Sequence, residues 1–335
     1  MTNPEAILVI GPRWVGDMVM AQCLFSALKE KYPDAAIDVM APAWAGPLVG
    51  RMPEVRERLD APFGRGRLEI GSRWRAARRL RGRYAQAYVM QGNWKSALIP
   101  LFAGIRKRVG YLKEFRYGLL TDIVPLPREI KRRTARTFFG LARGGTYRDP
   151  HLSVDAANQE NLFATYGLTR GNYAVLMPGA EYGPAKRWPP ERYAALAGAL
   201  IKRGMRVVLL GSANDRPVTR EIVALAPGTL DLAGETRLED AIDLTAGAVF
   251  AVSNDSGLMH IAAAVDTPVI AIFGSTSPDN TPPLTEAREL VTLRLSCSPC
   301  HARVCPLGHM NCLNHISVEQ VLVAADRLTA GRQPA

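Results

Sequence analysis

Short apolar strands alternate with helical segments in both halves of the chain, and this alternation restricts the fold more than any other feature. The first half has apolar runs at about 6–10, 36–40 and 86–90, with helical stretches at about 15–31, 44–51, 68–81 and 94–102. The second half has apolar runs at about 173–177, 206–210, 248–252 and 268–273, with helical stretches at about 190–202, 216–226, 238–246 and 257–264. Strands joined through helices form parallel sheets. The sequence therefore predicts an α/β fold with two Rossmann-like, doubly wound domains.

Two glycines, Gly167 and Gly171, punctuate the chain between these halves and mark the expected domain boundary. We expect an N-terminal domain at 1–168, a second domain at 169–316 and a C-terminal helix within 317–335 that packs back on the N-terminal domain. Ligands of doubly wound sheets bind beyond the carboxyl ends of the strands. The expected site is therefore a cleft that the two domains face.

The positive charge of the chain is confined to its first half. The whole chain of 335 residues has a formal net charge of +11, and residues 1–168 contain 27 basic and 15 acidic residues, a net charge of +12. Residues 169–335 contain 15 basic and 16 acidic residues, a net charge of −1. Such a basic half is typical of a domain that meets nucleic acid, a membrane surface or a phosphorylated substrate. A solvated, arginine-rich surface is the other interpretation.

Many of these basic residues crowd one segment that also contains Trp74 and Leu80. The arginines of this segment are Arg65, Arg67, Arg73, Arg75, Arg78, Arg79, Arg81 and Arg83. A basic helix with apolar neighbours can lie on an anionic membrane surface, and it can equally present a solvated face. The chain carries no motif of a nucleic-acid-binding module.

No apolar run approaches the roughly 20 residues needed to cross a bilayer. The N-terminal residues also lack the basic and apolar regions of a secretory signal. We therefore expect a cytoplasmic protein whose five cysteines are reduced.

The first candidate site is the segment Gly11–Met18, where the first strand turns into the first helix. Its glycines allow a tight turn and a close approach of a ligand. The carboxylate of Asp17 can accept a proton from an incoming hydroxyl, or it can simply favour the start of the helix. The glycine spacing differs from the dinucleotide-binding pattern, so the segment does not indicate a nicotinamide site.

The second candidate, Met177–Pro189, follows the first strand of the second half. Gly179 and Gly183 allow an irregular loop, and Lys186 and Arg187 place two cations beside it. Cations in this position suit a diphosphate leaving group, because its charge grows as it departs. An ordinary surface loop is the alternative.

The third candidate, Val252–His260, passes from a strand into a helix. The N–H groups of Ser256, Gly257 and Leu258 lie where helix starts bind anions. Asp255 can contribute to a site or cap the helix. His260 lies about one turn into the helix, where a histidine is more often structural than catalytic. A loop of small polar residues, 273–283, follows the last clear strand and can line the same site.

Four cysteines, Cys297, Cys300, Cys305 and Cys312, lie close together with histidines nearby. Such spacing is compatible with a tetrahedral zinc ion, with reduced structural thiols or with a redox pair. Four thiolate ligands would leave no open position on the metal, so zinc here would be structural.

Seven segments spread over about residues 7–284 resemble, in order, the heptosyltransferase II group of glycosyltransferase family nine. They are Ile7–Met18, Asp38–Trp44, Ser96–Ile105, Arg116–Leu120, Pro178–Pro189, Asn254–His260 and Ser277–Leu284. The resemblance implies the two-domain GT-B fold. It also implies an inverting transfer of L-glycero-D-manno-heptose from ADP-heptose, with no metal required for catalysis. The implied acceptor is the first heptose of the lipopolysaccharide inner core.

The resemblance also assigns roles to individual residues. Asp17 matches the general base and Lys186 the lysine that contacts phosphate. The implied donor-binding residues are Gly179, Arg187, Gly211, Ser212, Gly234, Glu235, Thr236, Asp255, Ser256, Gly257, Leu258 and His260. The expected acceptor-binding residues are Arg13, Trp14, Gly16, Asn93 and Lys95.

The implied partners are ADP-heptose, the inner-core acceptor and an anionic membrane surface, with no nucleic acid. The implied location is cytoplasmic, peripheral on the cytoplasmic face of the inner membrane. Two alternatives remain from the sequence. One is another GT-B enzyme, a different nucleotide-sugar transferase or an epimerase. The other is a non-catalytic protein that binds an ADP-sugar or scaffolds a membrane surface.

Overall fold

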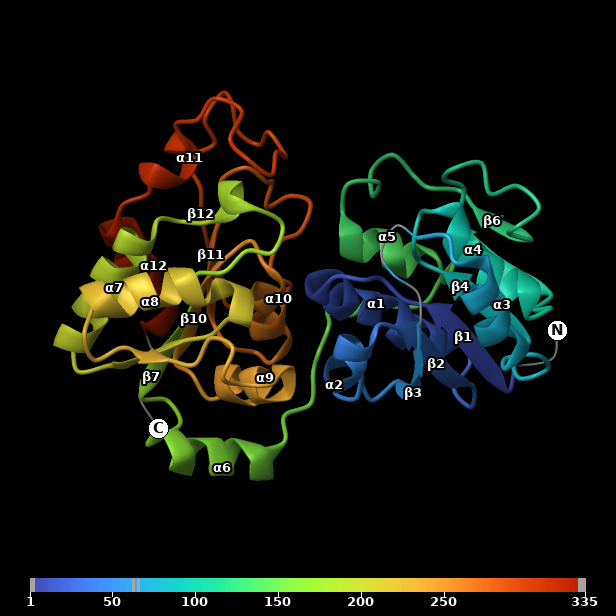
Figure 1. Ribbon diagram of the computed structural model, residues 1–335, viewed down its shortest axis with the longest axis horizontal. Coiled ribbons are helices and arrows are strands. Elements are labelled where there is room, and N and C mark those ends of the chain that lie inside the picture. The colour runs from blue at the N-terminus through green and yellow to red at the C-terminus, as the bar shows by residue number, and fades with distance from the viewer. Residues whose placement is uncertain (1–3, 62–63, 65–66, 331–335) are drawn as a thin grey trace. The chain divides into compact units, whose positions relative to one another are not determined.

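The computed structural model describes residues 4–61, 64 and 67–330, which form two compact units that divide between Pro150 and His151. Each unit is built on its own six-stranded sheet with helices packed against it (Figure 1). Every strand pair in both sheets is parallel. The prediction of two doubly wound α/β domains is confirmed.

The sheet of the first unit has the strand order β3-β2-β1-β4-β5-β6. Its strands are β1 (Ala6–Ile10), β2 (Ala36–Ala41), β3 (Val55–Asp60), β4 (Gln86–Val89), β5 (Lys107–Tyr111) and β6 (Asp122–Val124). The helices of this unit are α1 (Val15–Lys31), α2 (Gly46–Val49), α3 (Ile70–Arg78), α4 (Trp94–Phe102) and α5 (Thr134–Gly140), with a short 3₁₀ turn at Ala43–Ala45.

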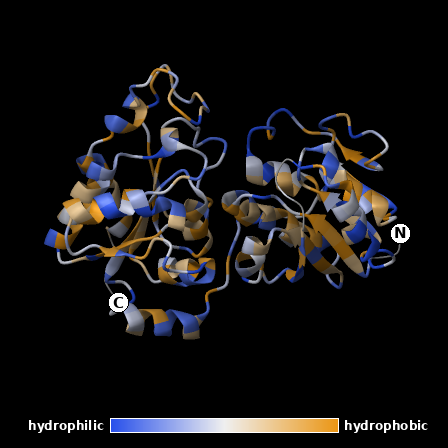
Figure 2. Ribbon diagram, viewed as in Figure 1, coloured by the Kyte–Doolittle hydropathy of each residue, from blue (hydrophilic) through white to orange (hydrophobic). Residues whose placement is uncertain are grey.

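The centre of this sheet is apolar on both faces, as expected for a parallel sheet covered by helices. All five residues of β1 are buried. Helix α1 is buried along most of its length and packs against α5. In Figure 2 the central strands of this sheet have hydrophobic colours, whereas the surrounding helices and loops show hydrophilic and hydrophobic colours together. Burial on two faces explains why the central strands were readable as continuous apolar runs.

The sheet of the second unit has the order β12-β11-β10-β7-β8-β9. Its strands are β7 (Tyr173–Met177), β8 (Arg206–Leu209), β9 (Leu230–Asp231), β10 (Phe250–Asn254), β11 (Val269–Ile272) and β12 (Arg288–Val291). The helices are α6 (Ala156–Tyr166), α7 (Pro190–Lys202), α8 (Arg216–Leu225), α9 (Leu238–Ala246), α10 (Gly257–Ala264), α11 (Asn311–Asn314) and α12 (Val318–Thr329), with 3₁₀ turns at Pro184–Lys186 and Ala213–Asp215.

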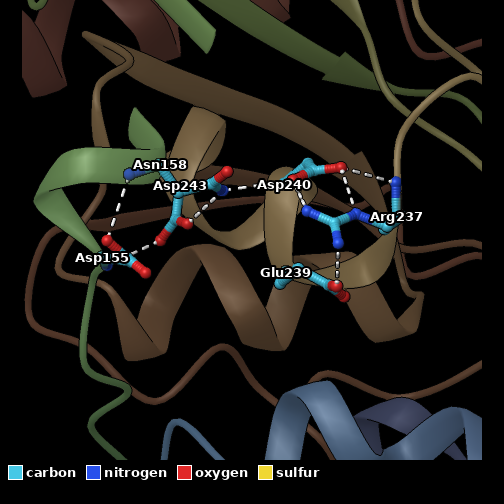
Figure 3. Close-up of polar contacts among 6 residues, drawn as sticks. All are labelled: Asp155, Asn158, Arg237, Glu239, Asp240 and Asp243. Carbon is cyan, nitrogen blue, oxygen red and sulfur yellow. Dashed lines mark hydrogen bonds and ion pairs between the residues drawn. The ribbon is translucent and has the colours of Figure 1, made fainter. Parts of the chain in front are cut away.

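The expected boundary at residue 168 is wrong, because α6 belongs to the second unit and not to the first. The helix packs against α9. Asn158 donates from Nδ2 to Asp243 Oδ2 at 2.7 Å and to Asp240 Oδ1 at 3.1 Å, and the main-chain N–H of Asp155 donates to Asp243 Oδ1 at 3.0 Å. Figure 3 shows this network joining the start of α6 to α9. Glycines mark the end of α6 in the sequence, but these side-chain contacts decide the unit to which it belongs.

The C-terminal helix, α12, packs on the sheet and on α7 of its own unit, whereas the sequence had led us to expect it on the N-terminal domain. Val321, Ala324 and Ala325 are buried in the core of the second unit, together with residues of α7, β10 and β11. Ser317 and Gln320 form the predicted capping box at the start of the helix. The apolar face of α12 is therefore buried within the second unit.

Helix α3 covers the centre of the arginine-rich segment and is shorter than the predicted stretch. Arg65 lies outside the described residues. Within the described part of the chain, no helix is both long and apolar enough to cross a bilayer.

The α6–α9 network generates a prediction about stability. Asp243 is fully buried, and both of its carboxylate oxygens accept hydrogen bonds from α6 or its N-cap. In Asp243→Asn an amide N–H₂ group replaces one of the two carboxylate oxygens. It then faces an N–H donor of Asp155 or Asn158, with which it cannot form a hydrogen bond. We expect the free energy of unfolding, measured by urea denaturation, to fall by about 1–3 kcal/mol. Glu160→Gln, on the exposed side of α6, is the control and should change little. Equal stability of the two variants would contradict the role given to the network.

Candidate functional site

The first unit contains a pocket of about 730 Å³ at the carboxyl ends of β1 and β4. The loop after β1 contributes Pro12, Arg13 and Trp14, and the first turn of α1 contributes Asp17. The loop after β4 contributes the residues from Met90 to Asn93. Strand β1 pairs directly with β4, so neighbouring strands deliver both loops to the same edge of the sheet.

Four of the five expected acceptor-binding residues line this pocket together with Asp17. They are Arg13, Trp14, Asn93 and Lys95. Gly16 is buried in the first turn of α1 and is not among the lining residues. Asn93 also caps α4, because its Oδ1 accepts the N–H of Ser96 at 3.0 Å.

Cations predominate in the lining of the pocket. Its basic residues are Arg13, Arg67, Arg73, Lys95, Lys113 and Lys131, and its acidic residues are Asp17 and Glu114. Lys113 and Lys131 were not singled out from the sequence, since each lies in a loop without a recognisable local motif. The lining suits a ligand that carries several negative charges.

Two buried arginines fix the walls of the pocket. Arg73 donates to the carbonyl oxygens of Leu68 at 2.6 Å, Lys95 at 3.1 Å and Arg67 at 3.2 Å. Arg116 donates to the carbonyl oxygen of Gln91 at 2.7 Å and also to that of Tyr111. Burial lowers the pKa of both guanidinium groups from the usual value. Arg73 is therefore a structural part of the pocket and not a member of a solvated arginine face.

Gln91 connects the two main loops of the pocket. Its Nε2 donates to the carbonyl oxygen of Gly11 at 2.6 Å, and its Oε1 accepts from Asn93 Nδ2 at 3.2 Å. The turn before α1 is thus tied to the loop after β4, which holds Asp17 in a defined place relative to the cations.

A second cluster of polar residues lies at the carboxyl ends of β7 and β10 in the second unit. Lys186 Nζ contacts Asp255 Oδ2 at 2.6 Å, and Thr276 Oγ1 donates to the same oxygen at 2.6 Å. The side chains of Lys186 and Asp255 are only 13% and 6% exposed. Two separate sequence candidates therefore meet in one ion pair, and Thr276 of the small polar loop holds its carboxylate.

Asn254, the last residue of β10, positions this cluster. Its Oδ1 accepts the N–H of Trp188 at 3.0 Å and the hydroxyl of Tyr193 at 3.1 Å, and its Nδ2 donates to the carbonyl oxygen of Pro178 at 2.7 Å. The loop that carries Lys186 is thereby fixed to the end of β10. No local sequence signal indicated this role for Asn254.

The other expected donor-binding residues of α10 surround the ion pair. Ser256 is the N-cap residue, but its side chain does not cap the helix; its Oγ lies 3.2 Å from Ser253 Oγ. Gly257 and Leu258 are partly buried in the first turn. Burial lowers the pKa of His260 to about 4, so this imidazole is neutral near pH 7.

A third group of predicted residues gathers around Asp215, which the sequence analysis missed. Asp215 Oδ2 accepts from the N–H of Ser212 at 2.9 Å and from Ser212 Oγ at 2.8 Å. An added Cβ at Gly179 would lie 2.4 Å from the Asp215 carboxyl carbon, and one at Gly211 would lie 3.0 Å from its Cβ. Arg187 NH2 lies 3.9 Å from Asp215 Oδ1. The loops after β7 and β8 therefore converge on one carboxylate.

The loop after β9 joins this group through Arg216. Its NH2 donates to the carbonyl oxygen of Gly234 at 3.1 Å and also pairs with the carboxylate of Glu235. Gly234 has a φ of +69°, a conformation that favours glycine. The hydroxyl of Thr236 donates to the carbonyl oxygen of Leu232 at 3.4 Å.

The four clustered cysteines lie on the segment between β12 and α12, and all are free thiols. Among the residues that the structure describes, no three His, Cys, Asp or Glu side chains are grouped so that they could hold a metal ion. Zinc binding at these thiols therefore stays a prediction that the described arrangement does not support. The segment does contact the Lys186 loop, since Arg303 O accepts the N–H of Ala185 at 3.1 Å and Tyr182 OH donates to His301 O at 2.8 Å.

Comparisons with known proteins agree with this geometry. The model of glycosyltransferase family 9 (heptosyltransferase) matches residues 73–311, more than half of the chain. The chain belongs to glycosyltransferase family 9. The resemblance inferred from the sequence motifs is thus confirmed, and the chain is a member of a family of glycosyl-transferring enzymes.

The relatives of this family 9 member include lipopolysaccharide heptosyltransferase 2 of Salmonella typhimurium, 45% identical over 86% of this chain and 88% of the relative. Lipooligosaccharide heptosyltransferase 2 of Haemophilus influenzae is 45% identical over the same shares. The solved structure of Escherichia coli ADP-heptose lipopolysaccharide heptosyltransferase II has a TM-score of 0.86 and 40% identity, covering 97% of this chain and 98% of that chain. The predicted GT-B fold is confirmed by this match.

The crowding around Asp215 generates a prediction about the expected donor-binding residues of this family 9 protein. In Gly179→Ala the new methyl group must displace the Asp215 carboxylate from its bonds to Ser212. We expect ADP binding, measured by calorimetry, to weaken by roughly tenfold. Gly198→Ala in α7 is the matched control, because a Cβ there meets nothing within 4 Å. An unchanged affinity in Gly179→Ala would remove the Asp215 group from the nucleotide site.

Proposed function

We propose that this protein transfers L-glycero-D-manno-heptose from ADP-heptose to the first heptose of the lipopolysaccharide inner core. The observation that carries the proposal is the position of Asp17 in a cation-lined pocket. The identity of 45% to a lipopolysaccharide heptosyltransferase 2, over 86% of this chain, supports it. A nucleotide-sugar donor and a lipopolysaccharide acceptor are thus its proposed substrates. Family membership favours a transferase over an epimerase or a non-catalytic binding protein.

The acceptor binds in the pocket of the first unit in this proposal. The six basic side chains of the lining match the phosphates and carboxylates of a lipopolysaccharide core. Asp17 takes the proton of the acceptor hydroxyl as that oxygen forms a bond to the anomeric carbon of the donor heptose. The bond from the anomeric carbon to the diphosphate oxygen breaks on the opposite side, which inverts the configuration.

The ADP leaving group binds in the second unit. Lys186 and Arg187 neutralise the charge that grows on the diphosphate, and the first turn of α10 adds its N–H groups. Lys186 is paired with Asp255, so the diphosphate competes with this carboxylate. The neutral His260, whose pKa is influenced by both members of the pair, adds no charge of its own.

We propose that the protein works in the cytoplasm, peripherally attached to the cytoplasmic face of the inner membrane. The acceptor of the proposed reaction is anchored in a lipid bilayer. The charge of the chain supports this location, because residues 1–150 contain 27 basic and 13 acidic residues, a net charge of +14, and residues 151–335 contain 15 and 18, a net charge of −3. The unit that contains the acceptor pocket is the unit that an anionic surface attracts.

The role of Asp17 is tested by ADP release from ADP-heptose in the presence and absence of a purified inner-core acceptor. We expect Asp17→Asn to lower acceptor-dependent kcat by roughly 10²–10⁴-fold, because a general base is lost, with the Kd for ADP unchanged. Asp34→Asn, which alters an exposed carboxylate of the same unit, should retain full activity. Near-normal turnover by Asp17→Asn would exclude Asp17 as the base, and acceptor-independent release by the wild type would exclude the transferase.

The proposed reaction also needs no metal ion for catalysis, because Lys186 and Arg187 supply the positive charge at the diphosphate. We expect a chelator to leave kcat/KM within about twofold of the untreated value, since no charge at the leaving group is removed. The same assay with added Mg²⁺ is the companion measurement. A strict requirement for a divalent ion would show that the two cations are insufficient.

A further inference from the structure

The first unit exposes large apolar side chains in three short segments around its pocket. Phe115 is 89% exposed, Tyr117 64% and Ile70 53%, and Trp74, Trp94 and Leu112 are each more than a third exposed. Among the described residues of this unit, Trp44 is the one other exposed large hydrophobic side chain. We call these six residues the apolar rim: Ile70, Trp74, Trp94, Leu112, Phe115 and Tyr117.

Hydrogen bonds hold the three segments of the apolar rim together. The N–H of Trp94, the first residue of α4, donates to Glu114 Oε2 at 3.1 Å, which fixes the loop of Phe115 to the start of α4. Arg73 of α3 donates to the carbonyl oxygen of Lys95 at 3.1 Å, which fixes the start of α3 to the same place. Trp94, Glu114 and Arg73 all line the pocket. The apolar rim therefore borders the cation-lined pocket.

Cations are interleaved with the apolar rim. Arg75 and Arg78 are exposed on α3, Lys113 is exposed between Leu112 and Phe115, and Arg67 lies on the pocket wall. The Arg78 guanidinium lies 5.5 Å from the centroid of the Trp74 ring. Exposed aromatic and aliphatic side chains among arginines and lysines are the composition that partitions into the interface of an anionic bilayer.

This composition distinguishes between possible occupants. A nucleic acid would use the cations but leave exposed aliphatic side chains such as Ile70 in water. A bilayer can contact both the cations and the apolar side chains. Its anionic headgroups pair with the arginines and lysines, while the apolar side chains enter the boundary between headgroups and acyl chains. The first unit also has the net charge of +14 that such a surface attracts.

We propose that the apolar rim docks on an anionic lipid bilayer, so that the pocket beside it receives its acceptor directly from the membrane surface. The inference rests on the proposed function for the nature of the acceptor. The membrane contact itself rests on the exposure, placement and charge of the rim. Phe115 and Ile70 are its two fully apolar anchors, since neither carries a polar group, neither lines the pocket and both are more than half exposed.

The docking is tested by co-sedimentation with vesicles of phosphatidylcholine and phosphatidylglycerol. We expect the double variant Phe115→Ser/Ile70→Ser to bind these vesicles at least roughly tenfold more weakly than the wild type, because two apolar side chains no longer enter the bilayer. The matched control, Leu225→Ser/Val304→Ser, removes two side chains of the second unit that are 56% and 67% exposed, and it should bind like the wild type. Equal binding by the rim variant and the wild type would overturn the proposal.

Kinetics separate this proposal from the proposed function. The rim variant should lose kcat/KM on acceptor embedded in vesicles and keep its value on a deacylated, water-soluble acceptor, with an unchanged Tm. Equal losses on both acceptors would overturn docking as the role of the rim. If the wild type turns over neither acceptor, the proposed function fails, while the sedimentation result still decides whether the rim binds a bilayer.

Discussion

The reversal of strand order at the centre of each sheet is the constraint on which both candidate sites depend. In the first unit the chain moves outward from β1 through β2 to β3 and returns to pair β4 with β1, and in the second unit β10 pairs with β7 in the same manner. Loops after two such neighbouring strands lead to opposite faces and leave a crevice between them. Asp17 and Gln91 follow one pair of strands, and Lys186 and Asp255 follow the other. The same topology thus builds the proposed acceptor pocket in one unit and the proposed donor site in the other.

Buried cations maintain the first of these sites. Arg73 and Arg116 are 4% and 1% exposed, and both donate hydrogen bonds to main-chain carbonyl oxygens. A buried guanidinium is costly unless it is well hydrogen-bonded, so the surrounding loops must adopt the conformation that offers these carbonyls. Carbonyl oxygens accept these hydrogen bonds without cancelling the full positive charge. The two residues therefore fix the loops and also raise the electrostatic potential of the pocket, which favours an anionic ligand.

The sequence alone was sufficient to predict helices and strands where local sequence signals and tertiary structure agree. The bounds of β1, α1, α4 and β7 were predicted to the residue, because apolar runs and helical periodicity end at clear breaks. Strand β3 (Val55–Asp60) was missed because charged residues alternate through an edge strand, and β9 has only two residues. Asp215 was missed for another reason. Its sequence context is that of an ordinary helix start, and its importance comes from Gly179, Gly211 and Arg187, which only the folded chain brings beside it.

The charge balance of the donor site has a consequence for turnover. Lys186 is paired with Asp255, and Arg187 lies near Asp215, so each cation of the proposed leaving-group site already has a carboxylate beside it. A diphosphate must compete with these carboxylates, which weakens the binding of donor and of product ADP relative to unpaired cations. The diphosphate competes better as the bond breaks, because the charge on the leaving oxygen is then larger than in the intact donor. The paired cations thus bind the intact donor weakly and interact more strongly with the charge that grows during bond breaking, while the carboxylates also limit the retention of ADP.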